Sequence, residues 1–315
     1  MTRWRRSDAF LPSPLTAAGS VELAVVERGG FAESRHLGAA VLVDLDGRVL
    51  LAWGDPEALI YPRSAAKPMQ ASAVLGTGVE LSGEQLALAT ASHAGTPAHV
   101  AVVEGMLAAI GLDETALQCP ADWPLDSAAR TDATERRRLT MNCSGKHAAF
   151  LTAAVHNGWS TADYLEPTHH VQRAVATTIE NLAGEHISHW GTDGCNAPTP
   201  VISLTGLARS FSSIVTSGSP LVAAMHAHPW AIDGPGRENA VTIAETGLLA
   251  KVGAEGVLVL ATDGGQAVAI KTLDGANRAR TAVGLEILVR AGLLARAHAD
   301  AVLAVVGEPG LRVAL

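Results

Sequence analysis

The chain is short of three things: cysteine, charge and long apolar runs. Its 315 residues hold three cysteines, Cys119, Cys143 and Cys195, so one thiol stays unpaired in any disulfide scheme. Free thiols are typical of a reducing compartment, which favours the cytoplasm. Charged residues make up 17% and the formal net charge is -8, so no basic face for nucleic acid is indicated. No apolar run has the length and flanks of a membrane span, so we expect no membrane contact.

The N-terminal region lacks the features of a targeting segment. Arg3, Arg5 and Arg6 are not followed by an apolar run of signal-peptide length. We therefore expect residues 1–20 to form a flexible tail. Beyond them, 48% hydrophobic residues are enough for a buried core in a chain of about two ordinary domains.

Few of the basic residues are lysines. Of the 23 basic residues only four are lysines, Lys67, Lys146, Lys251 and Lys271. Lysine can lose its proton in a protein and arginine cannot, so each retained lysine is a candidate for work as a neutral amine. Genomic base composition would produce the same bias without any chemical role.

Strand-like and helix-like patterns alternate in a simple order. Short apolar runs over residues 21–55 predict three antiparallel strands. Residues 63–76 predict a helix whose first turn is irregular because of Pro68. Further helical patterns fill residues 81–207 and 220–230. The strongest hairpin signal pairs residues 252–262 with 266–275, and a last helix is expected over 277–294.

This order predicts an α/β fold whose antiparallel sheet is flanked by helices and built from both ends of the chain. The sheet domain is expected to comprise residues 21–80 together with 208–315. A mostly helical insertion occupies residues 81–207. The chain contains no internal repeat and no low-complexity linker.

Two short motifs could carry chemistry. Ser64 and Lys67 are three residues apart at the expected helix start, which puts both side chains on one face, where a neutral lysine could deprotonate the serine. The plainer alternative is a helix-capping serine beside a surface lysine. Lys251, followed two residues later by Gly253, resembles the lysine-x-glycine strand motif of serine β-lactamases, penicillin-binding proteins and serine-dependent glutaminases. A lysine at the edge of a strand is also a common solvation device.

Six sequence blocks make the resemblance more specific. They resemble, in order, the signature blocks of the rhizobial-type (class 3) L-asparaginase family, also called asparaginase II, and they read YPRSAAKPMQ, ASHAGTPAHV, NCSGKHAAFL, TDGCNAPTP, AHPW and AKVGAEGV. The resemblance implies a serine β-lactamase-like fold, a homodimer, and hydrolysis of L-asparagine to L-aspartate and ammonia. One departure stands out: the stretch around residues 210–239 is shorter than is usual in the family, and we expect this to alter substrate closure or dimer contacts.

The resemblance also implies roles for particular residues. It makes Ser64 with Lys67 and Ser92 with Lys251 two catalytic pairs. It implies a zinc ion held by Cys143, Lys146 and Cys195. Thiolates are good zinc ligands, whereas lysine binds a metal only after losing its proton.

Alternatives to these roles stay open. From the residues alone, Cys143 and Cys195 could equally be small buried residues. His147, His169 and His170 are alternatives to Lys146 as the third ligand. Ser92 would by default be a turn or capping residue.

Arg63 and Asp193 are candidates for binding the substrate's α-carboxylate and α-amino groups, and His147 is a third candidate contact. Arginine holds carboxylates by paired hydrogen bonds, and a carboxylate balances an ammonium. Each could instead belong to a structural ion pair.

The expected reaction is acyl transfer, in which Ser64 attacks the side-chain amide, ammonia leaves and water hydrolyses the acyl-enzyme. Three rival functions remain: a zinc hydrolase that uses metal-bound water, a glutaminase or other amidase on the same scaffold, and a catalytically silent amino-acid-binding protein.

Overall fold

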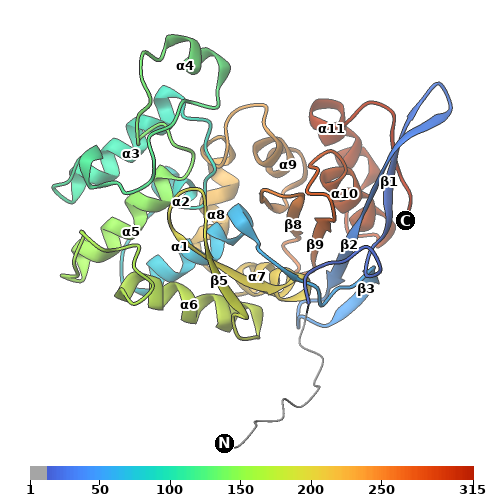
Figure 1. The fold of residues 1–315 in the computed structure, drawn as a ribbon, viewed down its shortest axis with the longest axis horizontal. Helices are drawn as coiled ribbons and strands as arrows, with labels where there is room; N and C mark the ends of the chain where they lie inside the picture. The colour runs from blue at the N-terminus through green and yellow to red at the C-terminus, as the bar shows by residue number, and fades with distance from the viewer. Residues whose placement is uncertain (1–12) are drawn as a thin grey trace, which may run out of the picture.

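The computed structural model describes residues 13–315, and its sheet is built from both ends of the chain (Figure 1). Three strands follow one another near the N-terminus, as predicted: β1 (Val21–Arg28), β2 (Phe31–Val43) and β3 (Val49–Trp53). Three more come from the C-terminal half: β7 (Leu249–Val252), β8 (Val257–Ala261) and β9 (Ala267–Thr272). With β10 (Leu311–Val313) they form an antiparallel sheet in the order β10-β1-β2-β9-β8-β7, and β3 also pairs with β2.

The long strand β2 joins the two halves of this sheet. Its first part pairs with β1, and its second part, from Gly38 to Val43, pairs with Thr272 to Ala267 of β9. The second half of β2 is buried on both sides, as are all residues of β8, which agrees with a sheet that has helices on both faces.

The predicted hairpin is present as β8 and β9, but Lys251 is not on its first strand. Lys251 lies on a separate strand, β7, that pairs with β8 through Val259. A turn separates the two strands, with Glu255 and Gly256 at φ of 61° and 68°. The expectation of a single strand from residue 252 was wrong because this left-handed turn interrupts the apolar run.

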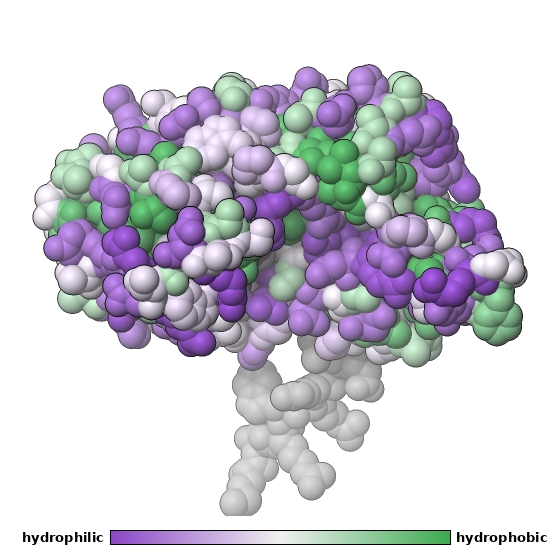
Figure 2. Space-filling model, turned by 90° about the horizontal axis from the view of Figure 1, so that it is seen from above, coloured by the Kyte–Doolittle hydropathy of each residue, from purple (hydrophilic) through white to green (hydrophobic). Residues whose placement is uncertain are grey.

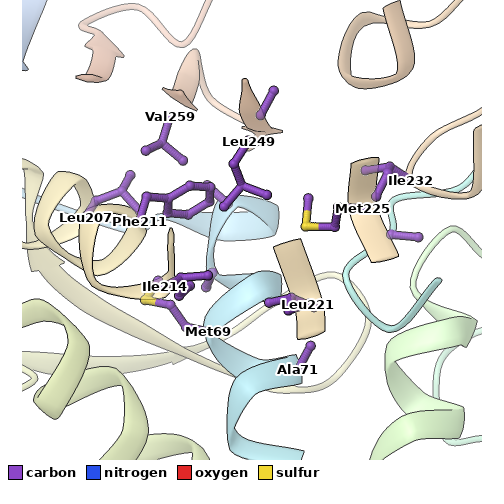
Figure 3. Close-up of a cluster of buried hydrophobic side chains, with 14 of the residues drawn as sticks. Met69, Ala71, Leu207, Phe211, Ile214, Leu221, Met225, Ile232, Leu249 and Val259 are labelled. Atoms are coloured by element: carbon purple, nitrogen blue, oxygen red, sulfur yellow. The ribbon is translucent and has the colours of Figure 1, made fainter. Parts of the chain in front are cut away.

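Helices cover both faces of the sheet. Helix α7 (Leu204–Thr216) lies on one face, where Phe211 and Leu249 belong to the same cluster of buried side chains (Figure 3). Helix α10 (Arg280–Arg290) packs on the other face, against β8 and β9. Helix α11 (Arg296–Val306) follows it and packs against α10 and α9 (Glu238–Thr246).

The middle of the chain is mostly helical, as predicted, but it also contains strands. The bounds of its helices are α2 (Gly83–Ala89), α3 (Pro97–Ala109), α4 (Ser127–Asp132), α5 (Ser144–His156), α6 (His170–Ala183) and α8 (Pro220–Ala227). A second, three-stranded sheet runs β4-β6-β5, from β4 (Leu59–Ile60), β6 (Pro198–Ser203) and β5 (His189–Thr192). The sequence did not predict these short strands, two of which contain proline or glycine.

The segment carrying the Ser-x-x-Lys motif has the irregular first turn that Pro68 predicts. Residues Arg63–Ala66 form a 3-10 turn, and helix α1 (Lys67–Gly76) begins at the lysine itself. Buried side chains from α1, α7 and α8 meet here, among them Met69, Ile214 and Leu221 (Figure 3). This packing fixes the start of α1, and with it Lys67, in the interior.

Part of the predicted tail is anchored. The amide of Leu59 donates to the carbonyl of Ser13 at 2.9 Å, and Pro14 forms a bridge with Leu59. The prediction of a flexible tail therefore does not hold from residue 13 on, while residues 1–12 lie outside the described part.

The surface of the protein mixes hydrophobic and hydrophilic residues, and the helices of the described part are unlike membrane spans. On the face shown in Figure 2, hydrophobic residues form separate patches among hydrophilic ones. Within residues 13–315, none of the helices combines the length and the apolar character needed to cross a membrane.

Candidate active site

Ser64 lies at the wall of a cavity. The cavity has a volume of about 360 Å³, and Ser92 lines it as well. The hydroxyl of Ser64 forms no side-chain hydrogen bond with another described residue. It is thus free to meet a molecule that enters the cavity.

The second serine is held between two lysines. The Nζ atoms of Lys67 and Lys251 lie 2.9 and 3.2 Å from the hydroxyl oxygen of Ser92. Lys67 also donates to the carbonyl of Ala91, and Lys251 donates to the carbonyl of Val252 at 3.0 Å. The structure therefore brings Ser92 and Lys251 together, but Lys67 hydrogen-bonds Ser92 rather than Ser64.

Gly253 explains why the lysine strand ends as it does. A Cβ atom at residue 253 would lie 2.4 Å from the carbonyl oxygen of Pro62, nearer than real Cβ contacts come. Only glycine lets strand β7 pass so close to the turn that carries Ser64. The lysine-x-glycine motif thus places Lys251 against the Ser64 turn.

The loop that carries Ser92 is fixed on both sides. The amide of Ser92 donates to the carbonyl of Ile232 at 2.8 Å, and the amide of His93 donates to the carbonyl of Asn142 at 3.1 Å. The buried ring of His93 also pairs with the hydroxyl of Ser144 at 2.8 Å. Ser92 is therefore positioned by backbone contacts to two distant segments.

Lys251 is completely buried, and burial has a chemical consequence. Loss of solvent and the nearby charge of Lys67 together lower the pKa of Lys251 to about 7. The negative charge of Asp233 opposes this shift only in part. At neutral pH a substantial fraction of Lys251 is therefore a neutral amine that can accept a proton.

A buried network behind the cavity supports the lysine strand. The carboxylate of Asp233 accepts from the amide and side chain of Asn239 at 2.8 and 2.9 Å, and from the amide of Ala240 at 3.1 Å. The side-chain oxygen of Asn239 in turn accepts from the amide of Val252 at 2.8 Å. The backbone next to Lys251 is thereby tied to the start of α9.

A buried ion pair forms another part of the cavity wall. Arg280 makes a two-point contact with Glu238, and it also donates to the carbonyl of Gly253 at 2.6 Å. The side chain of Arg280 is 6% exposed and that of Glu238 is 24% exposed, so the pair is largely shielded from solvent. The opposite charges of Arg280 and Glu238 therefore cancel one another.

The predicted metal ligands form a buried thiol cluster. The Nζ of Lys146 lies 3.1 Å from the sulfur of Cys195. A hydrogen bond from Cys143 and the charge of Lys146 hold the pKa of Cys195 far below the usual thiol range, against the effect of burial. Burial favours a neutral Lys146, but the two thiols outweigh it and raise the pKa of this lysine. Cys143 and Cys195 are free thiols, as is Cys119.

The side chains of Cys143, Lys146 and Cys195 suit a metal that prefers sulfur ligands, provided that Lys146 is neutral. The Nε2 atom of His147 is buried without a hydrogen-bond partner among the described residues, and burial lowers the pKa of that ring although Cys195 opposes the shift. However, no three His, Cys, Asp or Glu side chains within residues 13–315 come close enough to hold a metal by themselves. Lys146 must therefore contribute its amine, and to do so it must first lose its proton.

The other two histidines are engaged elsewhere. His169 caps the N-terminus of α6, where it accepts from the amide of Val171 and pairs with the carbonyl of Ser160. His170 stacks on Trp159 with ring centroids 5.1 Å apart.

Arg63 and Asp193, which were predicted to bind the α-carboxylate and α-amino head group of the substrate, bind one another. The guanidinium of Arg63 donates to one oxygen of Asp193 at 2.8 and 3.0 Å. Neither residue lines the cavity of Ser64 and Ser92. Arg63 has a φ of 54°, which is strained for a residue with a side chain, so the ion pair helps to hold the turn that presents Ser64.

Comparison with known proteins identifies the family of this chain. The family model described as L-asparaginase II matches residues 24–313. The chain belongs to the L-asparaginase II family. It is accordingly an enzyme of asparaginase-type amidohydrolase activity, as predicted. No curated protein matches this chain.

Two solved structures are similar to this asparaginase-family enzyme. One is a β-lactamase from Mycobacterium bovis, with 18% identity, a TM-score of 0.43, and coverage of 85% of this chain and 94% of the other. The other is Mglu in its glutamate form, with 14% identity, a TM-score of 0.48, and coverage of 90% of this chain and 65% of the other.

Sequence reasoning missed several residues of the asparaginase-family site. Asp233, Arg237, Glu238 and Asn239 line the cavity with Ser64 and Ser92. They belong to the segment that directly follows the AHPW block. A carboxylate and an arginine on either side of a Gly-Pro-Gly turn were the available signal, because charged side chains on a tight loop are frequently functional.

Proposed function

We propose that this enzyme hydrolyses L-asparagine to L-aspartate and ammonia by acyl transfer to a serine. The observation that supports this most directly is the hydroxyl of Ser92 between the amines of Lys67 and Lys251, at the wall of a cavity that Ser64 also lines. A hydroxyl among buried amines, one of them with a pKa of about 7, is the arrangement that serine-lysine hydrolysis needs.

Ser64 is the proposed nucleophile. Its hydroxyl is free at the cavity wall, whereas that of Ser92 is already held by two lysines and suits a proton relay. Ser64 Oγ bonds to the amide carbon and passes its proton through Ser92 to neutral Lys251. The carbon–nitrogen bond then breaks, and the proton returns to the leaving nitrogen, which departs as ammonia. Water, activated by the same relay, hydrolyses the ester and restores the hydroxyl.

We also propose that Cys143, Lys146 and Cys195 hold zinc, with the unpartnered ring nitrogen of His147 as a fourth donor. The chemistry that a bound zinc ion supplies is polarisation of an oxygen atom of the substrate. The Lys146 and Cys195 pair would have to give up the proton that it holds without metal, so zinc uptake should release protons.

Ammonia release tests the function. We would measure it with L-asparagine, L-glutamine and simple amides, with and without chelator. Turnover of asparagine above the others supports the proposal, and preference for glutamine makes the enzyme a glutaminase. Binding of asparagine without ammonia release identifies a silent binding protein.

The choice of nucleophile needs its own experiment. Mass spectrometry of a trapped acyl-enzyme should locate the acyl group on Ser64, and a modified Ser92 alone would reverse the assignment. Near-normal turnover by Ser64→Ala would instead favour attack by metal-bound water.

Two further properties are proposed, the first from the family resemblance and the second from the three free thiols. The enzyme should be a homodimer, which light scattering would reveal. It should reside in the cytoplasm, which cell fractionation would test.

A further inference from the structure

The cavity of Ser64 and Ser92 has a distinctive distribution of charge. Four charged side chains line it: Asp233, Arg237, Glu238 and Arg280. Two of these, Glu238 and Arg280, form a buried two-point ion pair and cancel one another. This leaves one cation, Arg237, and one anion, Asp233, which matches the opposite charges of an α-amino acid.

Arg237 has a fixed backbone and an unoccupied guanidinium. Its amide donates to the carbonyl of Gly234 at 3.2 Å, and its own carbonyl begins α9 by accepting from Val241 at 2.9 Å. The side chain does not cap the helix, and it forms no hydrogen bond or ion pair with another described residue. The other arginine of the cavity, Arg280, has all of its nitrogens engaged.

The turn before Arg237 directs its side chain. Gly234 has a φ of 129°, and a Cβ atom there would lie 3.1 Å both from the Cδ of Arg237 and from the Cβ of Ala94. The stem of Arg237 therefore passes closely over the backbone of Gly234, beside the loop that carries Ser92. Glycine at this position keeps room for the stem between the two segments.

Asp233 is the matching anion. It is 4% exposed and accepts two hydrogen bonds on Oδ2 but only one on Oδ1. A carboxylate offers about four lone-pair sites, so Oδ1 can accept one more donor from the cavity. An incoming ammonium would supply that donor and would balance a charge that is otherwise buried.

We propose that Arg237 binds the α-carboxylate of the substrate and Asp233 its α-ammonium, in the cavity that Ser64 and Ser92 line. Arg63 and Asp193 are then not head-group ligands; they are a structural ion pair that holds the Ser64 turn. This inference rests on the proposed function and adds the residues that select an amino acid as substrate.

The test compares substrates that lack one charged group. Succinamate is asparagine without its amino group, and β-alaninamide is asparagine without its carboxylate. Arg237→Gln should lower kcat/KM for asparagine and succinamate about 10- to 100-fold, because a charge-assisted contact is lost. For β-alaninamide it should change kcat/KM by less than about threefold. Asp233→Asn should show the reverse selectivity: kcat/KM should fall by a larger factor for asparagine and β-alaninamide than for succinamate, whose smaller change reports the effect of Asp233 on Lys251.

Matched variants guard against general damage. Arg173→Gln removes another exposed arginine, on α6 and away from the cavity, and should leave all substrates unaffected. Arg63→Gln and Asp193→Asn should lower turnover of every substrate by similar factors. If these two variants instead discriminate between the substrates and Arg237→Gln does not, the inference is overturned. Arg237 is exposed, so its replacement should not unfold the protein even if Asp233→Asn does.

Failure of the inference can be told apart from failure of the proposed function. If the wild type releases no ammonia from asparagine, the function fails, and the inference is tested by calorimetry with L-aspartate. Binding that weakens about 10- to 100-fold in Arg237→Gln, but not in Arg173→Gln, upholds the head-group site. No binding of L-aspartate, or equal binding by all variants, overturns it.

Discussion

Lys251 and Lys146 are equally buried, at 0% and 3% exposure, yet their protons behave in opposite ways. Burial alone would lower the pKa of both. Lys251 faces the cation of Lys67, and its pKa falls to about 7, whereas Lys146 faces two thiols and its pKa rises. The comparison shows that burial does not by itself make a lysine a base; the sign of the neighbouring charge decides.

The largest effect should come from removing the lysine with the lowered pKa. Lys251→Met keeps the length of the side chain but removes the proton acceptor, so ammonia release should fall about 100- to 10,000-fold. Lys271→Met is the matched control, because Lys271 lies on β9 and does not line the cavity. Equal activity of the two variants would show that Lys251 is not the base.

Removing a cysteine from the thiol cluster should lower the stability of the protein. Cys195→Ala leaves the buried amine of Lys146 without its hydrogen-bond partner, and an uncompensated buried charge costs about 3 kcal/mol of unfolding free energy. Cys119→Ala, which removes a buried thiol bonded only to a carbonyl, should cost roughly 1 kcal/mol. Denaturant unfolding would measure both, and similar losses would mean that Lys146 is already neutral.

Zinc should invert the difference between the two lysines. With the metal bound, Lys146 must be a neutral amine, and at a free zinc concentration of 100 times Kd the enzyme should gain about 2.7 kcal/mol of stability. Thermal unfolding with added zinc and with chelator would show the shift, and Lys146→Met should abolish it. A shift that persists in Lys146→Met would place the metal elsewhere.

The pH profile should show the smallest effect. Because the pKa of Lys251 is lowered to about 7, the lysine gains a proton below that pH and ceases to be a base. The value of kcat/KM for asparagine should therefore drop about tenfold for each pH unit below 7 and level off above it. A plateau reached only near pH 10 would mean that the active amine has the pKa of an exposed lysine.

Much of this fold could be predicted from the sequence because short apolar runs are separated by Gly and Asp turn residues. The strands of residues 21–55 and the hairpin of β8 and β9 follow from apolar alternation and from the Asp263-Gly264-Gly265 turn. Strands β5 and β6 could not be predicted in this way, since they are short and β6 contains Pro198 and Pro200.

The site was predictable only in part. Spacing pointed to Ser64 and Lys67 as a pair, because side chains three residues apart share one face of a helix. The helix begins at Lys67, and the amine of this lysine is drawn to Ala91 and Ser92. Contacts between residues so far apart along the chain carry no local signal. Asp233 and Arg237 had a local signal in the Gly-Pro-Gly turn between them, but only the folded chain brings their loop to the cavity.

The close approach of Gly253 to Pro62 joins two segments that are far apart in the sequence, and the complete site requires both segments to be in place. The hydrogen bond from Lys251 to Ser92 spans 159 positions of the sequence, so no early, local piece of the chain can contain the complete site. Contacts of such long separation form late, since a large loop must close before they stabilise anything. Recovery of ammonia release during refolding should therefore lag behind recovery of helical signal, and the last step should be the arrival of strand β7.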